Sequence, residues 1–338
     1  MKVLVTGAAG QVGCRLVRQL LERNHEVRGT LLPDDPSSDR VEGLDIELVE
    51  GDLTDEAYVK HIVDGVEAVI HTANYVGPQF DNNLQTNRLI SRACGERADS
   101  LDRYIYVSSS SVFPNNGESV ACSYHPVDEL HPKKPDGEYG LGKLFGEQFA
   151  EMESRRSGLR TVIVRPSHVL SGTAILKRFS VGVVCGVLRS GQSKPASEMH
   201  IPDGTELWHD VEAAAKSSDQ LCSACDLDGC PWYYQPNDAR DIAHLLVCAL
   251  EHPAAIGESF NCGAPAVFTF PEATEILAEH TGEEVLEVSL PVRWQYDHDM
   301  TKAKSWIDFQ PRGDLRTMIK SARLFEAGEH DGYTWDGI

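Results

Sequence analysis

The chain has 338 residues, of which 41% are apolar and 25% are charged. This balance excludes the collagen-like, disordered and small disulfide-scaffold classes, and the length allows two modest domains or one large α/β domain with an appendage. The 31 Lys and Arg and 52 Asp and Glu residues leave a net charge of −21, so we expect neither nucleic acid nor a membrane surface as a partner.

Short apolar runs alternate with amphipathic helical segments through the first half, which is typical of a parallel sheet with helical crossovers. The predicted strands cover residues 2–6, 26–31, 46–50, 68–71, 104–108 and 161–165. The predicted helices cover residues 11–23, 82–98 and 139–156. One more predicted helix follows the third strand, with Thr54 as its cap. We therefore predict an α/β fold with a doubly wound parallel sheet, the Rossmann arrangement.

The pattern loosens beyond Gly172, where Gly, Pro, Ser and four cysteines occur without clear periodicity. We expect residues 173–236 to be irregular and to lie on the substrate side. Two later helices are predicted, at residues 241–250 and 271–281. The predicted organisation is a dinucleotide-binding domain at 1–172, a smaller C-terminal substrate-binding region at 173–327 whose residues 236–250 pack back on the first domain, and a loosely held tail at 328–338.

A glycine-rich turn lies between the first predicted strand and the first predicted helix. Gly7, Gly10 and Gly13 permit a tight turn, close approach of a pyrophosphate to backbone N–H groups and close helix packing. The alternative is a set of turn glycines without a ligand. The position between strand and helix favours dinucleotide binding.

An acidic residue, Asp52, follows the third predicted strand and precedes Leu53. Its carboxylate could accept a hydrogen bond from an adenine amino group, with Leu53 against the ring. The alternative is a plain turn with a helix cap, and the two residues alone leave both interpretations open.

Tyr139 and Lys143 are spaced i,i+4 on a predicted helix, which places the phenol and the ammonium group on one face. An ordinary tyrosine has a pKa of about 10, and a fixed cation beside it favours the phenolate. Four serines, Ser108 to Ser111, follow the fifth predicted strand, where ligands bind in such sheets. One hydroxyl could hold a substrate oxygen beside the phenol, and the alternative is a polar loop start.

Together these motifs resemble the extended short-chain dehydrogenase/reductases, the NAD-dependent epimerase/dehydratase family. The resemblance covers residues 1–172 closely and 235–325 loosely. It rests on TGxxGxxG at residues 6–13, the Asp52-Leu53 pair, the strand-four segment at 69–73, the strand-five signature at 106–113, YxxxK at 139–143 and RPxxV at 165–169.

The resemblance implies roles for individual residues. Tyr139 and Lys143 become the catalytic pair, and the position three before Val112 makes Ser109 the catalytic hydroxyl, with Ser110 as the alternative. The implied cofactor-binding residues are Gly7, Ala9, Gly10, Gln11, Val12, Gly13, Leu32, Asp52, Leu53, Thr72, Ala73, Asn74, Val107, Tyr139, Lys143 and Pro166. The implied substrate contacts are Ser110, His168 and Arg240. The family's structural asparagine corresponds to Asn82, with Asn83 as the alternative.

The cofactor expected from the resemblance is NAD, with NADP as the alternative. The 2′-phosphate of NADP requires an arginine near the end of the second strand, where this chain has Leu32. Arg28 and Arg40 are the residues that would allow NADP. A homodimer is also expected.

The implied reaction is hydride transfer between NAD(P) and a secondary hydroxyl or ketone, with Tyr139 moving the proton. A sugar or sugar nucleotide is the first expected substrate, processed by oxidation, reduction, dehydration or epimerisation. His168, which stands where many sugar-nucleotide members have asparagine, weakens the case for a sugar nucleotide. The second expected function is a ketone or aldehyde reductase or a hydroxysteroid-type dehydrogenase. A non-catalytic dinucleotide sensor is a further alternative, which the joint presence of Tyr139, Lys143 and Ser109 disfavours.

The nine cysteines, an odd number, are typical of reduced thiols in a cytosolic enzyme. A structural zinc site usually takes two closely spaced ligand pairs, and Cys222, Cys225 and Cys230 lack a second pair, so no metal site is predicted. No apolar run approaches the ~18 residues of a membrane span, and the first strand ends before a signal-peptide core develops. We therefore expect a soluble, cytoplasmic protein.

Overall fold

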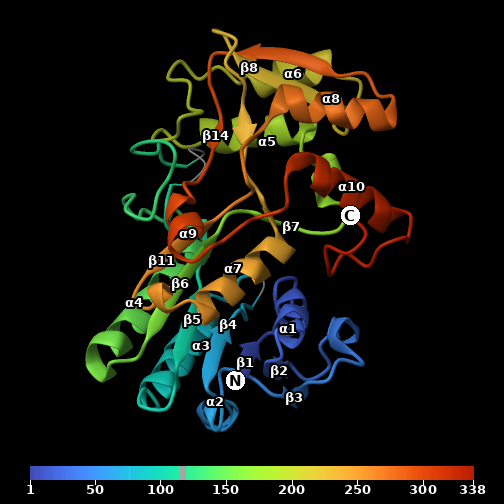
Figure 1. The fold of residues 1–338 in the computed structure, drawn as a ribbon. Coiled ribbons are helices and arrows are strands. Elements are labelled where there is room, and N and C mark those ends of the chain that lie inside the picture. The colour runs from blue at the N-terminus through green and yellow to red at the C-terminus, as the bar shows by residue number, and fades with distance from the viewer. Residues whose placement is uncertain (76, 115–118) are drawn as a thin grey trace.

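The computed structural model describes residues 1–75, 77–114 and 119–338. A seven-stranded sheet at its centre has the order β11-β6-β5-β4-β1-β2-β3, and every neighbouring pair is parallel (Figure 1). The strands are β1 (Lys2–Thr6), β2 (Glu26–Leu31), β3 (Glu47–Glu50), β4 (Ala68–His71), β5 (Arg103–Val107), β6 (Thr161–Pro166) and β11 (Ser259–Cys262). The order reverses between β1 and β4, so the predicted doubly wound fold is confirmed.

One strand of the sheet, β11, was not predicted from the sequence. It lies at the edge beside β6, with Phe260 opposite Val164. Its four residues give too short a pattern to separate a strand from a loop, and its partner is distant in the chain.

Helices cover both faces of the sheet because its strands bury side chains on both sides. Val3 and Val5 of β1 pack into the core on one face, and Leu4 packs into the core on the other. The first face is covered by α1 (Gly13–Glu22) and α7 (Ala239–Glu251). The second is covered by α2 (Glu56–Val63), α3 (Phe80–Gly95) and α4 (Glu138–Ser157). The α7 helix thus packs back on the first domain, beside α1.

Helix ends follow the expected capping chemistry with one difference. The N-cap of α2 is Asp55, whose Oδ1 accepts a hydrogen bond from the Ala57 N–H at 2.8 Å. The predicted cap, Thr54, instead donates its N–H and its hydroxyl to Asp52. An aspartate at the N-cap satisfies an otherwise unpaired N–H of the first turn, so the start of α2 moves one residue along the chain.

The C-terminal region forms a second apolar core above the sheet (Figure 1). Its largest fully buried side chains include Phe179, Trp232, Phe270 and Trp294. The expectation of an irregular segment at 173–236 is wrong. That segment contains α5 (Val181–Gln192), α6 (Trp208–Ala214), β8 (Cys222–Asp226) and β9 (Tyr233–Tyr234).

The pairing of β8 explains why its sequence pattern was weak. It is stabilised by a parallel partner far along the chain, β13 (Leu286–Leu290), rather than by a local hairpin. The remaining elements are α8 (Phe270–Thr281), α9 (Thr301–Trp306), α10 (Leu315–Glu326), β7 (Val169–Leu170), β10 (Asn237–Asp238), β12 (Phe268–Thr269), β14 (Gln295–Tyr296), and the 3-10 helices η1 (Ser38–Val41), η2 (Ser110–Val112), η3 (Ala174–Lys177) and η4 (Pro253–Ala255).

The tail at 328–338, expected to be loosely held, docks on the first domain. The guanidinium of Arg18 lies 4.1 Å from the ring centroid of Tyr333, and that of Arg240 lies 3.7 Å from that of Trp335. Such cation–π contacts are short-range, so the tail is fixed against α1 and α7.

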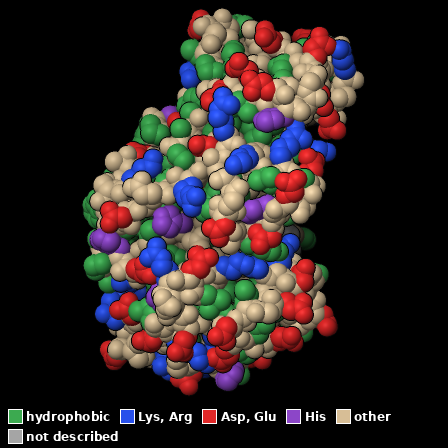
Figure 2. All heavy atoms as spheres, turned by 45° about the vertical axis from the view of Figure 1, so that its right-hand side comes forward, with side chains coloured by type: hydrophobic (Ala, Val, Ile, Leu, Met, Phe, Trp, Pro, Cys, Tyr) green, Lys and Arg blue, Asp and Glu red, His purple; other side chains and the backbone are tan. Residues whose placement is uncertain are grey.

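The surface carries both signs of charge. On the face drawn in Figure 2, Lys and Arg side chains are interspersed with Asp and Glu side chains rather than gathered into one patch. Within the described residues, no helix has the length and apolar character that a membrane crossing requires.

Candidate active site

The turn between β1 and α1 is as tight as its glycines allow. Gly7 has a φ of +67°, and its carbonyl accepts a hydrogen bond from the Gly10 N–H at 3.0 Å. A Cβ at Gly13 would lie 2.2 Å from the Gly7 oxygen. Val12, at the N-cap of α1, offers no side-chain cap, so the helix start is left to a ligand or water.

A cleft of about 570 Å³ opens along this turn and the ends of β2 and β4. Its lining includes many of the predicted cofactor residues: Gly7, Gly10, Gln11, Val12, Gly13, Leu32, Leu53, Thr72, Ala73 and Asn74. The volume suits an extended small-molecule ligand. Because Gly7 and Gly13 carry no side chain, the turn packs tightly and a pyrophosphate can lie close to its backbone. These residues therefore fit a dinucleotide.

Three predicted cofactor residues lie behind this surface. Ala9 is 1% exposed and belongs to the core, and Pro166 is a buried residue of β6. Val107 takes part in the site through its backbone, since its carbonyl accepts a hydrogen bond from the Lys143 ammonium group.

Asp52 lies at the end of the cleft with its carboxylate already bonded. Its Oδ1 accepts hydrogen bonds from the Thr54 N–H at 2.8 Å and from the hydroxyl of Tyr75. Desolvation raises the pKa of Asp52, but these hydrogen bonds hold it below its ordinary value. Tyr75, which the sequence analysis did not single out, therefore spans the cleft from the end of β4.

Tyr139 and Lys143 lie one helical turn apart on α4. The Lys143 side chain is buried, and its Nζ donates to the Val107 carbonyl at 3.0 Å and lies 5.8 Å from the Tyr139 ring centroid. Desolvation lowers the pKa of Lys143 to about 8, so the group is still mainly a cation at neutral pH. Tyr139 is 53% exposed.

The pKa of Tyr139 differs from the sequence expectation. Desolvation raises it, and a hydrogen bond with Ser109 works against that rise. The downward pull expected from Lys143 therefore does not dominate in this structure.

The structure separates the four serines by their partners. Ser109 is the one that bonds to Tyr139, and its Oγ also accepts from the Ser111 N–H at 3.1 Å. Ser108 donates to the buried Glu147 at 2.6 Å. Ser110 lies 3.3 Å from the Tyr296 hydroxyl. Ser109 is thus the hydroxyl placed beside the phenol.

A second cavity, of about 360 Å³, contains the catalytic candidates Tyr139 and Lys143. It adjoins the first cleft, because Asn74 and Tyr75 line both. The remaining lining residues are Gly77, Phe80, Asn83, Glu138 and Gly142. A ligand in the cleft and one in the cavity would meet at this shared wall.

The segment that forms the shared wall is held by Asn83. Its Oδ1 accepts from the Tyr75 N–H at 2.8 Å, and its Nδ2 donates to the Tyr75 carbonyl at 3.0 Å. Asn82, the first assignment from the sequence, points to solvent and donates to Gln79. Of the two asparagines, Asn83 is thus the one whose side chain bonds to this segment, and the assignment of the family's structural asparagine stays a prediction.

The buried Glu147, also missed as a site residue, anchors α4. Its carboxylate accepts from the Arg165 Nε at 2.7 Å, from the Lys133 Nζ at 2.6 Å and from Ser108. Desolvation raises the pKa of Glu147, but Arg165 and Lys133 hold it below its ordinary value. Nothing local in the sequence indicated this role, because the donors come from three separate segments.

Two of the predicted substrate contacts meet at one side chain: the Tyr296 hydroxyl accepts a hydrogen bond from the His168 N–H at 2.9 Å and lies 3.3 Å from the Ser110 Oγ, whereas Arg240 lies elsewhere. His168 is exposed. The centroid of its ring lies 5.9 Å from that of the Tyr234 ring, in an edge-to-face arrangement. Arg240 is 3% exposed and pairs with Asp238 at 2.7 Å beneath Trp335. This geometry gives Arg240 a role in holding the tail, and we do not place it in the substrate site.

Two of the three clustered cysteines, Cys222 and Cys225, lie in β8, and Cys230 follows it. Cys222 is fully buried in β8, and Cys225 and Cys230 are half-buried free thiols.

Fold and site together define a Rossmann-type architecture with a Tyr–Lys pair beside a cleft that fits a dinucleotide. A sequence profile of the NAD dependent epimerase/dehydratase family matches residues 3–212, and the chain belongs to this family. This predicted family is therefore confirmed, and with it an enzyme class that uses NAD.

The chain is similar to the 3 beta-hydroxysteroid dehydrogenase/Delta 5→4-isomerase of Mycobacterium tuberculosis, with 31% identity over 188 residues, covering 50% of this chain and 47% of that protein. The chain spans about half the length of the curated relatives it matches. An NAD-bound short-chain dehydrogenase/reductase superfamily protein from Agrobacterium tumefaciens is 26% identical, with a TM-score of 0.77, covering 97% of this chain and 98% of that one. The UDP-glucuronic acid 4-epimerase of Bacillus cereus, 19% identical with a TM-score of 0.69 over 98% of this chain and 100% of that one, shares the fold.

Proposed function

We propose that the protein is an NAD-dependent oxidoreductase or epimerase acting on a secondary hydroxyl or ketone of a small molecule. One observation carries this proposal: Tyr139 and Lys143 line a cavity that shares a wall with the glycine-rich cleft, and Ser109 interacts with Tyr139 and lowers its pKa. A non-catalytic sensor would not require these three side chains in one place.

The residues that would hold NAD are the glycine turn, Leu53 and the Thr72–Asn74 segment. When bound, NAD supplies the hydride chemistry. Tyr139 moves a proton to or from the substrate oxygen, and Ser109 holds that oxygen by a hydrogen bond. The Lys143 cation, fixed by the Val107 carbonyl, favours the phenolate when the proton leaves.

Whether the net reaction is epimerisation or oxidoreduction depends on the fate of the ketone. A ketone that stays bound and is reduced on its other face becomes an epimer, whereas a released ketone gives net oxidation. The same residues perform the proton transfer in both cases.

We propose a sugar or sugar nucleotide as the first substrate class. Asn74, Asn83 and Glu138 give the cavity polar groups that can bind hydroxyls. Phe80 and Tyr75 in the same lining, together with the similarity to the steroid dehydrogenase, favour a less polar ketone as the second candidate. The cytoplasmic location and the homodimer stay predictions.

The first test addresses the proton transfer. Tyr139→Phe removes the hydroxyl alone, so turnover should fall by about 10² or more while NADH affinity is nearly unchanged. Lys143→Ala should lower both the turnover and the affinity for NADH. Tyr333→Phe, which keeps the tail ring against Arg18, is the matched control and should retain full turnover. Near-normal turnover of Tyr139→Phe would exclude the mechanism.

The second test addresses the cofactor. Asp34 and Asp35 line the cleft beside Leu32, and their carboxylates would repel a 2′-phosphate. Arg28 is engaged with Glu47 at 3.0 Å and Arg40 donates to the Ala9 carbonyl, so neither guanidinium is free of other partners. A fluorescence titration should give NADH binding about 10-fold or more tighter than NADPH.

Asp34→Asn removes one of these negative charges and should therefore narrow the difference in affinity between NADH and NADPH. Asparagine also tolerates the positive φ of 58° at this position, so the substitution should not strain the backbone. Asp99→Asn, on the exposed turn after α3, is the control and should leave the ratio unchanged. Tighter binding of NADPH by the unaltered protein would contradict the proposal.

The third test addresses the substrate. UDP- and dTDP-hexoses and free sugars are assayed against aromatic and steroid-like ketones, with cofactor absorbance followed and products analysed separately for epimers. We expect turnover of a sugar class; epimerisation recycles the cofactor and appears only in the product analysis. Turnover confined to the apolar ketones would overturn the sugar assignment.

A further inference from the structure

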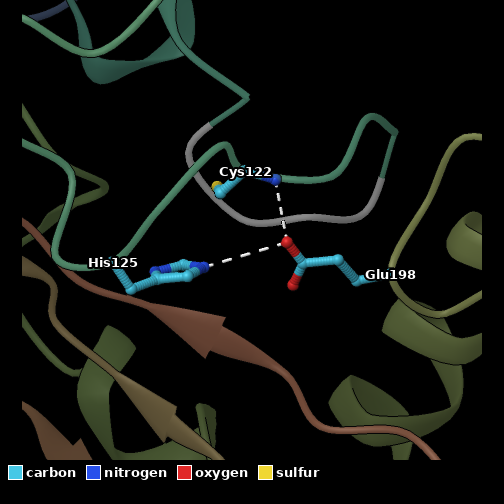
Figure 3. Close-up of side chains that lie close together, drawn as sticks. All are labelled: Cys122, His125 and Glu198. Carbon is cyan, nitrogen blue, oxygen red and sulfur yellow. Dashed lines mark hydrogen bonds and ion pairs between the residues drawn. The ribbon is translucent and has the colours of Figure 1, made fainter.

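Three ligand-type side chains converge outside the proposed active site, two from the connection between η2 and α4 and one from the connection between α5 and α6. One potential ligand atom from each of Cys122, His125 and Glu198 lies within 4.8 Å of those from the other two. Figure 3 shows the Glu198 carboxylate facing both the Cys122 backbone and the His125 ring. Each residue is half-buried, so an ion could reach the group from solvent.

The backbone fixes the two segments that provide these side chains. The Ala121 N–H donates to the Ala196 carbonyl at 2.8 Å, and the Cys122 N–H donates to the Glu198 Oε1 at 2.8 Å. Among the described residues, the hydrogen bond and the ion pair of Glu198 both involve Oε1. The cluster is therefore held by hydrogen bonds that a bound ion would not need to break.

The imidazole of His125 is oriented from behind. Its Nδ1 lies 2.6 Å from the Asp297 Oδ1, and Asp297 also accepts from the Tyr233 hydroxyl at 3.2 Å. Its Nε2 is buried, has no hydrogen-bond partner among the described residues, and lies 3.8 Å from the Glu198 Oε1. A histidine whose far nitrogen bonds to a carboxylate is the usual outer-shell arrangement of a metal ligand.

We propose that Cys122, His125 and Glu198 bind a divalent, zinc-type metal ion, with His125 oriented by Asp297. Thiolate, imidazole and carboxylate are the donors that zinc takes, and three protein ligands leave a fourth position for water or another ligand. The ion would join the 119–131 connection to the 194–200 segment. This proposal does not depend on the proposed function.

Binding is an exchange of a proton for the ion. The metal–sulfur bond forms as the Cys122 thiol proton, now donated to the Pro114 carbonyl, leaves to solvent, and the metal–nitrogen bond forms at the Nε2 lone pair of a neutral His125 whose Nδ1–H faces Asp297. One proton leaves and a divalent ion arrives, so the charge of the cluster rises by one. The competing arrangement is a protonated His125 that merely bridges Asp297 and Glu198 as an ion pair.

The test uses the full chain, stripped of metal by a chelator and titrated with Co²⁺ and then Zn²⁺. We expect one Co²⁺ per chain with a thiolate-to-cobalt charge-transfer band, which Zn²⁺ displaces. Cys122→Ser should abolish the band, whereas Cys230→Ser, a half-buried thiol outside the cluster, should retain it. If the unaltered protein shows no band, or if Cys122→Ser shows an unchanged band, the proposal is overturned. The ion pair of His125 with Asp297 and Glu198 is then the remaining explanation of the cluster.

A second variant keeps the test decisive if Cys122→Ser does not fold. Asp297→Asn leaves all three ligands in place and removes the orienting charge, so Co²⁺ affinity should fall by about 10- to 100-fold while the band remains. Unchanged affinity in Asp297→Asn would contradict the orientation of His125 and with it the proposed site.

Discussion

The buried carboxylate of Glu147 is the interaction on which the geometry of the active site depends. A carboxylate without solvent is costly unless it is paired, and here donors from the end of β5, from β6 and from the connection before α4 all meet it. Because Tyr139, Lys143 and Glu147 recur every fourth residue on α4, fixing the last of them fixes the face that carries the other two.

The close approach of α4 to the sheet completes this constraint. A Cβ at Gly146 would lie 2.0 Å from the Tyr106 hydroxyl, so only glycine lets the helix lie this near β5. At that distance the Lys143 ammonium group reaches the Val107 carbonyl, and Ser109 reaches Tyr139. The wall formed by Asn74 and Tyr75 then joins the catalytic face to the cofactor cleft. The chemistry thus follows from how one helix is held.

The parts of the fold that the sequence predicted are those with local signals. The buried strands, the glycine turn and the Tyr139–Lys143 spacing each occupy a few adjacent residues whose pattern has one physical meaning. The choice between Asn82 and Asn83 shows the limit of such patterns, since adjacent helical residues point about 100° apart and only the packing of α3 decides between them. Glu147 was beyond local reasoning because its partners lie in distant segments, and the same holds for the contact of Arg240 with Trp335.

The measurement that tests this account most directly is urea unfolding of Glu147→Gln against Glu151→Gln, one turn further along α4 and paired with Arg155 near solvent. Leaving Arg165 without its buried partner should cost about 3–5 kcal/mol, whereas the control should change stability by about 1 kcal/mol or less. The Glu147 contribution is present above the ordinary glutamate pKa and is lost as pH falls through its lowered folded value, so the difference should shrink in acid. Equal, small losses in both variants at neutral pH would contradict the account.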